Sequence, residues 1–158
     1  MNIFLLDQIT EVKLGKSANA IKCISYSDEI LRSHFTGNPI FPGIFIIEGL
    51  SQLSAFLLAT TIFQDSETIK NILLLSIPIF NFHKYSIPGD RLEYHSVLDS
   101  ICGDIAEFSV KATYNGELYC KGKIKQIMQE RKQKESDPKW VEAYRAWTRN
   151  LADCPNFR

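Results

Sequence analysis

The chain has 158 residues, of which 45% are hydrophobic, so it can fold as one domain with a full core. Eighteen basic and eighteen acidic side chains cancel, which argues against binding to nucleic acid or to an anionic membrane surface. The four cysteines form no Cys-x-x-Cys pair, and neither a signal peptide nor a membrane span is evident. These features predict a cytoplasmic protein with free thiols.

The first part of the chain predicts two strands and a short helical turn. Residues 3–14 are a mixed apolar segment that becomes a strand, and residues 15–16 form a turn. Residues 18–25 then alternate in side-chain character, as a second strand does. Residues 27–33 can form one helical turn, because Ser and Asp at its start are good helix caps.

A loop rich in glycine and proline then precedes a long apolar helix. The residues that restrict the loop backbone are Gly37, Pro39, Pro42 and Gly43. Residues 44–63 contain no proline and are nearly all apolar, which predicts a buried helix that is apolar on most sides. Glu48 and Gln52 are exceptions that share one helix face, and a buried carboxylate is costly unless it is paired, protonated or used. Glu48, and His34 at the start of the loop, are therefore candidate site residues.

The second half of the chain predicts a series of strands. Residues 72–82 are apolar and contain Pro78, which favours an edge strand or a bulge. Three further strands are predicted at residues 92–98, 106–112 and 118–125. Asn115-Gly116 between the last two is a strong hairpin signal. One buried helix with about six mostly antiparallel strands predicts an α+β layer arrangement. Because one sheet cannot cover a helix that is apolar all round, we also expect a partner subunit.

The chain after this sheet predicts a separate helical extension. Residues 130–137 are a charged break, and Asp137-Pro138 can begin a helix. An amphipathic stripe follows, formed by Trp140, Val141, Tyr144, Trp147 and Leu151. We therefore expect a main domain at residues 1–130 and a C-terminal helical extension at residues 131–158. The stripe can pack on its own sheet or dock a partner.

The loop and helix carry a motif that resembles the active-site signature of the 3-hydroxyacyl-(acyl-carrier-protein) dehydratases of the FabA/FabZ type. Its residues are His34-Phe35-x-Gly37-x-Pro39-x-x-Pro42-Gly43, followed by Glu48 and Gln52. Similar stretches stand at residues 4–7 and 87–92, so the resemblance covers roughly residues 3–128. It implies a hotdog fold, in which an antiparallel sheet wraps around a long central helix. In that family the residue at the Glu48 position tends to be Asp in the branch that also isomerises the product, so Glu48 favours simple dehydration.

The reaction that the resemblance implies is the loss of water from a 3-hydroxyacyl thioester to give a trans-2-enoyl thioester. It needs a base for the C2 proton, an acid for the leaving hydroxyl and a stabiliser for the thioester oxygen. His34 is the expected base, since imidazole changes protonation near neutral pH, and Glu48 the expected acid, since burial favours a neutral carboxyl group. The N–H of Gly43 is expected to polarise the thioester, with Phe41 and Gln52 completing the substrate-binding residues. No metal and no organic cofactor is implied.

The implied partners are an acyl carrier protein, which delivers the substrate, and a second copy of the chain. A trimer of dimers, or a heterodimer with a related subunit, stays open. A stripe of lysines at positions 121, 123 and 125 is either a solvated strand face or a docking surface for the acidic carrier.

Two alternative functions stay open beside dehydration, a hotdog acyl thioesterase and a non-catalytic partner subunit of a dehydratase. His34 and the intact His34–Glu48 pair argue against both. Thr36, where the motif usually has proline, and the C-terminal extension suggest a specialised relative, so fatty-acid, polyketide and polyene biosynthesis are all possible pathways.

Overall fold

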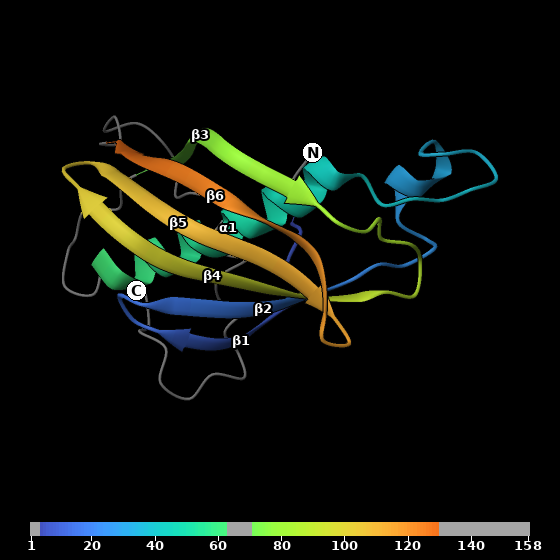
Figure 1. The fold of residues 1–158 in the computed structure, drawn as a ribbon, viewed down its shortest axis with the longest axis horizontal. Helices are drawn as coiled ribbons and strands as arrows, with labels where there is room; N and C mark the ends of the chain where they lie inside the picture. Colours follow the sequence, from blue (N-terminus) through green and yellow to red (C-terminus); the bar gives the residue numbers. More distant parts are fainter. Residues whose placement is uncertain (1–3, 63–70, 130–158) are drawn as a thin grey trace.

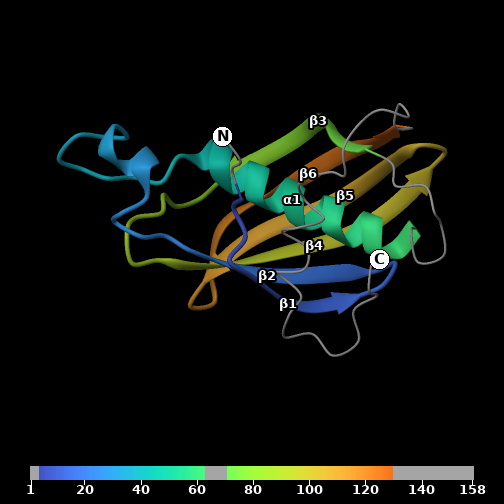
Figure 2. The same ribbon diagram turned by 180° about the vertical axis from the view of Figure 1, so that it is seen from behind.

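The computed structural model describes residues 4–62 and 71–129 and shows a long helix lying across one face of an antiparallel sheet (Figures 1 and 2). In chain order its elements are β1 (Gln8–Lys13), β2 (Ser17–Cys23), the 3-10 helix η1 (Glu29–Arg32), α1 (Gly43–Ile62), β3 (Asn71–Phe82), β4 (Arg91–Cys102), β5 (Ile105–Tyr114) and β6 (Glu117–Gln129). The predicted α+β arrangement is confirmed. The predicted C-terminal helix and the boundary near residue 130 lie outside the described residues.

The six described strands form one sheet in the order β1-β2-β4-β5-β6-β3, with every pair antiparallel. The hairpin between β5 and β6 turns at Asn115 and Gly116, whose φ angles of 51° and 79° are those that a tight two-residue turn requires. β3 does not join its neighbour in sequence, because the chain crosses the sheet through α1 and adds β3 at the far edge beside β6. α1 is thus part of the connection between β2, near one edge of the sheet, and β3, which forms the opposite edge.

The core lies between α1 and the sheet. The helix buries Leu50, Leu53 and Leu57 completely, and the sheet supplies Tyr94 and Phe108, which are also fully buried. Each such leucine contributes about 1.5–3 kcal/mol through burial of its side chain. α1 also has the length and apolarity of a membrane-spanning helix, but 67% of its apolar window is buried inside the protein, as expected of a core helix.

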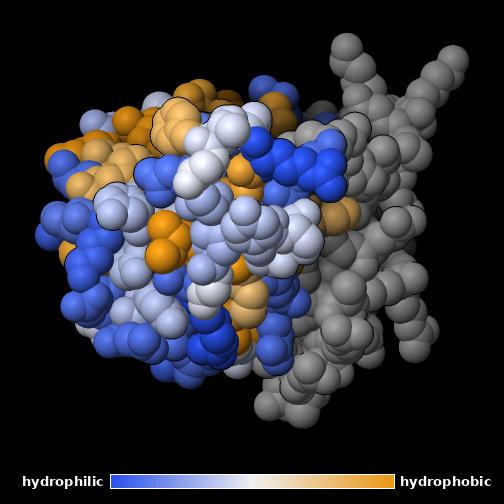
Figure 3. Space-filling view, turned by 90° about the vertical axis from the view of Figure 1, so that its right-hand side faces the viewer, coloured by the Kyte–Doolittle hydropathy of each residue, from blue (hydrophilic) through white to orange (hydrophobic). Residues whose placement is uncertain are grey.

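One face of α1 and the free edge of the sheet are not covered by the other described residues. On the helix, Ile44 is 63% exposed and Glu48 is also exposed. On β3 the exposed apolar side chains are Leu73, Leu74, Leu75, Ile77, Ile79 and Phe82. Figure 3 shows hydrophobic side chains gathered along the upper edge of the view, the side on which β3 runs in Figure 1. An exposed apolar edge strand is a template for pairing with another strand.

The prediction that Pro78 marks an edge strand or a bulge is confirmed on both counts. β3 pairs with β6 on one side only, and the register of that pair shifts between Ser76 and Ile79, around the proline. Since proline has no N–H to donate, an irregular position on an edge strand is where it disturbs the ladder least.

The prediction of free thiols is confirmed for the three cysteines in the described part of the chain. Cys23 and Cys102 are exposed and Cys120 is buried in the core, and none of the three is bonded to another cysteine. Burial raises the pKa of the Cys120 thiol to about 11, so this side chain is a protonated core residue at neutral pH. Cys154 lies outside the described residues.

His95 on β4 makes the stability of the fold depend on pH. Its Nδ1 lies 3.0 Å from Asn19 Oδ1 and its Nε2 lies 3.2 Å from Thr113 Oγ1. Burial and the nearby Lys111 lower the pKa of His95 below its ordinary value of 6.5, against an opposing effect of Glu93. The folded protein therefore holds this ring neutral in a pH range where the unfolded chain protonates it.

We expect the free energy of unfolding to decrease as the pH falls below about 6.5, because protons then bind preferentially to the unfolded state. His95→Gln should remove this contribution and flatten the dependence. Urea unfolding at a series of pH values between 7.5 and 5 measures it, with His83→Gln, at an exposed position, as the matched control. An unchanged slope in His95→Gln would contradict the assignment.

Candidate active site

His34 lies in the loop between η1 and α1, which extends beyond the N-terminal end of the helix (Figure 1). The loop is closed by its own backbone, since Phe35 and Asn38 exchange two hydrogen bonds and the Ile40 N–H donates to the His34 carbonyl oxygen at 2.8 Å. Gly37 has a φ of 79°, which an L side chain rarely adopts, so a glycine is required there. These features give the loop a defined shape around His34.

The imidazole of His34 is held in one orientation. Its Nδ1 lies 2.8 Å from the carbonyl oxygen of Ile40, and its ring stacks on Phe35 with the ring centroids 4.0 Å apart. Because a carbonyl oxygen only accepts hydrogen bonds, Nδ1 must carry the proton. In the neutral ring Nε2 is then unprotonated, and it is the nitrogen that can accept a proton from a substrate.

Gly43 is the first residue of α1, and its backbone N–H has no hydrogen-bond partner among the described residues. Such an N–H is free to bind an oxygen, and the helix dipole favours negative charge there. The ring of Phe82 lies beside its Cα. A Cβ at this position would lie 2.7 Å from the far end of that ring, which would have to shift to make room for a larger residue.

Phe41 lies beside this site as a core residue. It is 3% exposed, its ring packs against Phe45 and its backbone bridges to Ser86. Phe41 is among the residues that line the same cavity as His34 and Gly43.

Glu48 lies on the uncovered face of α1, so the prediction that its carboxyl group is buried is wrong for the single chain. The helix is apolar on most sides, as predicted, but the sheet covers only one side of it. Gln52, one turn further, donates from Nε2 to Glu48 Oε1 at 3.0 Å. The two polar residues that share this helix face are thus in direct contact.

His34 and Glu48 border different cavities of the chain. The cavity at His34 also contains Gly43, Phe82 and Lys84. The cavity at Glu48 has a volume of about 360 Å³ and lies between α1, β3 and β6. The side chains that line it are mainly apolar, with Phe4, Ala55, Phe56, Ile72, Leu73 and Leu74 beside Glu48, Ser51, Gln52 and Gln126. The chain therefore places its expected base and its expected acid apart.

Apart from Glu48 and Gln52, sequence reasoning missed the residues that line the cavity at Glu48. Gln126 is 1% exposed, and its Nε2 donates to the Ser51 carbonyl oxygen and lies 3.0 Å from Ser51 Oγ. A glutamine in a lysine-rich strand gives no local signal of such a role. Only the alternation of β6, which turns this position inward, could have indicated it.

The lysine stripe on β6 is less basic than the sequence suggested. Lys125 pairs with Glu107, and Lys123 Nζ lies 3.5 Å from Asp99 Oδ2. Lys121 has no ion pair in the described part of the chain and faces Lys111 across the strand pair. Two of the three lysines are therefore paired with acidic side chains on the same sheet face, which favours a solvated strand face over a basic docking surface.

Comparisons with known proteins place this arrangement in a family. A model of the FabA-like domain matches residues 1–128. The 3-hydroxyacyl-(acyl-carrier-protein) dehydratase FabZ of a Nitratiruptor species is 35% identical over 127 residues, which cover 78% of this chain and 86% of that protein. The enzyme of the same name from Helicobacter pylori (strain ATCC 700392 / 26695) is 32% identical over 132 residues, covering 82% and 83%.

Solved structures share the fold at low sequence identity. The dehydratase heterocomplex ApeI:P from Xenorhabdus doucetiae matches with a TM-score of 0.65 at 15% identity, covering 89% of this chain and 88% of that one. The uncharacterized protein PH1136 from Pyrococcus horikoshii matches with a TM-score of 0.61 at 20% identity, covering 81% and 86%. These likenesses concern the fold alone and confirm the predicted hotdog arrangement.

Proposed function

This chain belongs to the FabA-like family, and we propose that it removes water from 3-hydroxyacyl thioesters carried on an acyl carrier protein. The product is a trans-2-enoyl thioester, and the enzyme is a lyase of fatty-acid biosynthesis. The observation that carries the proposal within the structure is the orientation of His34, whose Nδ1 is tied to the Ile40 carbonyl oxygen while Nε2 is left to accept a proton.

Each bond change in this reaction has a residue to perform it. Nε2 of His34 takes the proton from C2, the electron pair of that C–H bond forms the C2–C3 double bond, and the C3–O bond breaks. Glu48 protonates the departing oxygen, so that it leaves as water. The N–H of Gly43, at the positive end of α1, hydrogen-bonds the thioester oxygen where negative charge develops. A proton passed back from His34 to Glu48 restores the enzyme.

The mainly apolar cavity at Glu48 is suited to the acyl chain. It begins at the carboxyl group and continues between α1 and β3, so a chain whose C3 hydroxyl meets Glu48 can place its hydrocarbon tail there. A mass-spectrometric dehydration assay on carrier-bound 3-hydroxyacyl chains of graded length tests the proposal. Release of free thiol without dehydration would instead indicate a thioesterase.

The proposal includes a homodimer in which each site is shared. His34 and Glu48 border different cavities, one helix face is uncovered, and the apolar edge of β3 is unpaired among the described strands. Antiparallel pairing of β3 with β3 of a second copy would continue the sheet and cover both helix faces about a two-fold axis. His34 of one copy would then meet Glu48 of the other in an apolar place. A cytoplasmic location is part of the same proposal, supported by the free thiols.

Leu75→Lys is expected to convert the dimer into a monomer, because it places two lysines near the centre of the paired edge strands. Leu75 is 47% exposed in the single chain, so the monomer itself should stay folded. Light scattering should show half the wild-type molar mass. Leu14→Lys, at a position that is 42% exposed in the turn after β1, is the control and should remain dimeric. A dimeric Leu75→Lys protein would contradict pairing through β3.

A further inference from the structure

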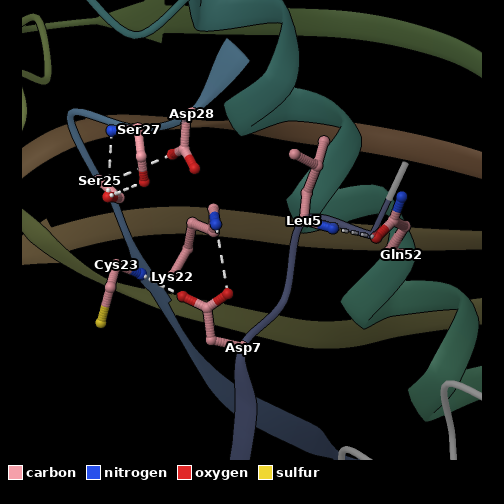
Figure 4. A network of polar contacts seen from close by, with 8 residues as sticks. All are labelled: Leu5, Asp7, Lys22, Cys23, Ser25, Ser27, Asp28 and Gln52. Carbon is pink, nitrogen blue, oxygen red and sulfur yellow. Dashed lines mark hydrogen bonds and ion pairs between the residues drawn. The ribbon is translucent and has the colours of Figure 1, made fainter. Parts of the chain in front are cut away.

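The carboxyl group of Glu48 is connected to the segment before β1 through one amide side chain. Gln52 Oε1 accepts a hydrogen bond from the backbone N–H of Leu5 at 2.9 Å, and Gln52 Nε2 donates to Glu48 Oε1 at 3.0 Å. Figure 4 shows the Leu5 nitrogen directed at Gln52 on α1. Because a backbone N–H can only donate, the atom that faces it must be the amide oxygen, and the amide nitrogen is therefore turned toward Glu48.

The Leu5 backbone is held against the helix by its surroundings. Its side chain is buried, and its carbonyl oxygen lies 3.1 Å from the point where a Cβ on Gly49 would stand. That point is also 2.6 Å from the ring of Tyr94, which is fully buried and has little room to move. The glycine one residue after Glu48 thus permits the close approach of this segment to α1.

Two residues further on, Asp7 fixes the same segment to β2. Its carboxylate oxygens bind Lys22 Nζ at 3.2 Å and the Cys23 N–H at 2.5 Å, as Figure 4 shows. The Lys22 side chain is only 10% exposed, so its ammonium group needs this carboxylate to offset the cost of burying a charge. These contacts at Asp7, together with the hydrogen bond from its own N–H to the Ile21 carbonyl oxygen, fix the chain two residues after the Leu5 N–H.

We propose that this relay, from Asp7 and Lys22 through the Leu5 N–H and Gln52, holds the transferable proton of Glu48 on Oε2. The inference rests on the proposed function, in which Glu48 protonates the leaving hydroxyl. A protonated carboxyl group has one oxygen that only accepts and one that carries the proton. Since Oε1 accepts from Gln52, the proton is held on Oε2, away from Gln52. Gln52, Asp7 and Lys22 are positioning residues.

Substitutions of Gln52 distinguish this role from simple packing of the segment. Gln52→Glu keeps the size of the side chain and can still accept from Leu5, but it turns an acceptor oxygen toward Glu48 Oε1 and draws the proton between the two carboxyl groups. We expect kcat to fall by roughly 10- to 100-fold, the range for residues that orient a reactive group. Gln52→Met, which removes the hydrogen bonds to Leu5 and to Glu48, should lose less. A packing role predicts instead that the isosteric Gln52→Glu retains wild-type kcat, and that result would overturn the proposal.

A backbone ester at position 5 tests the relay without changing any side chain. Replacing Leu5 with its 2-hydroxy acid by semisynthesis removes only the N–H and should lower kcat about 10-fold. In the Gln52→Met background the same ester should cause no further loss, because the two changes break one pathway. Glu11→Gln, which alters a polar contact between β1 and β2 at Asn19, is the control and should retain wild-type kcat. An equal loss from the ester in both backgrounds would overturn the relay.

Hydrogen exchange separates a failure of this inference from a failure of the proposed function. By NMR, the Leu5 amide should exchange more slowly in the wild type than in Gln52→Met. Equal rates would overturn the contact whether or not the protein is active. If the wild type dehydrates none of the 3-hydroxyacyl thioesters tested, the proposed function is wrong. The exchange rates would still show whether the hydrogen bond between the Leu5 N–H and Gln52 exists.

Discussion

Glu48→Gln is expected to lower kcat for dehydration by at least ~10²-fold, the usual scale for one general acid. The amide has the shape of the protonated carboxyl group, and its oxygen can still accept the hydrogen bond from Gln52 Nε2. Only the ability to release and recover a proton is lost. Steady-state kinetics on a carrier-bound 3-hydroxyacyl substrate measure the effect, and KM should change little because the acyl cavity is intact.

Two comparisons make the Glu48→Gln result specific. Because Glu48 is exposed in the single chain, the melting temperature should not fall, and a large fall would point to a structural role instead. Glu29→Gln, at an exposed position in η1, is the matched control and should keep wild-type activity. A Glu48→Gln enzyme with wild-type kcat would show that another group supplies the proton.

The local pattern of the sequence was sufficient for the elements that carry the site. Glycine and proline between residues 37 and 43 predicted the loop, and the apolar run after it predicted α1, which begins at Gly43. Pro78 predicted the irregular edge strand, and Asn115-Gly116 predicted the hairpin. The glycine, proline and Asn-Gly signals act through the backbone of their own residues, and the apolar run acts within one continuous segment, so none of them needs knowledge of distant contacts.

The contacts made across the chain could not be predicted in this way. Leu5 and Gln52 are 47 residues apart, and Gln126 and Ser51 are 75 apart, so nothing in a local window links them. The exposure of Glu48 is a case of the same kind. The apolar character of α1 indicated that the helix would be covered, but which of its faces is covered by its own sheet depends on the strand order. Sequence reasoning therefore assigned Glu48 to a buried place that the single chain does not provide.

Because His34 and Glu48 border different cavities of one chain, we expect two inactive variants to regain activity when they are mixed. If each site takes His34 from one copy and Glu48 from the other, His34→Ala and Glu48→Ala homodimers are both inactive. Mixing them in equal amounts with free subunit exchange makes half of the dimers mixed. In each mixed dimer one site has both defects, while the other has His34 from the Glu48→Ala chain and Glu48 from the His34→Ala chain. That second site is intact.

About a quarter of the wild-type activity should therefore return on mixing, since half of the dimers regain one of their two sites, as two-fold symmetry requires. Native mass spectrometry measures the mixed fraction in the same samples, so the recovered activity can be compared with the number of mixed dimers. The Leu75→Lys change, introduced into both inactive variants, should prevent recovery because the chains no longer pair. If both residues of a site came from one chain, every site would stay broken at any mixing ratio. Zero recovery in a sample with confirmed exchange would rule out the shared site and require His34 and Glu48 of one chain to meet by a movement of the loop.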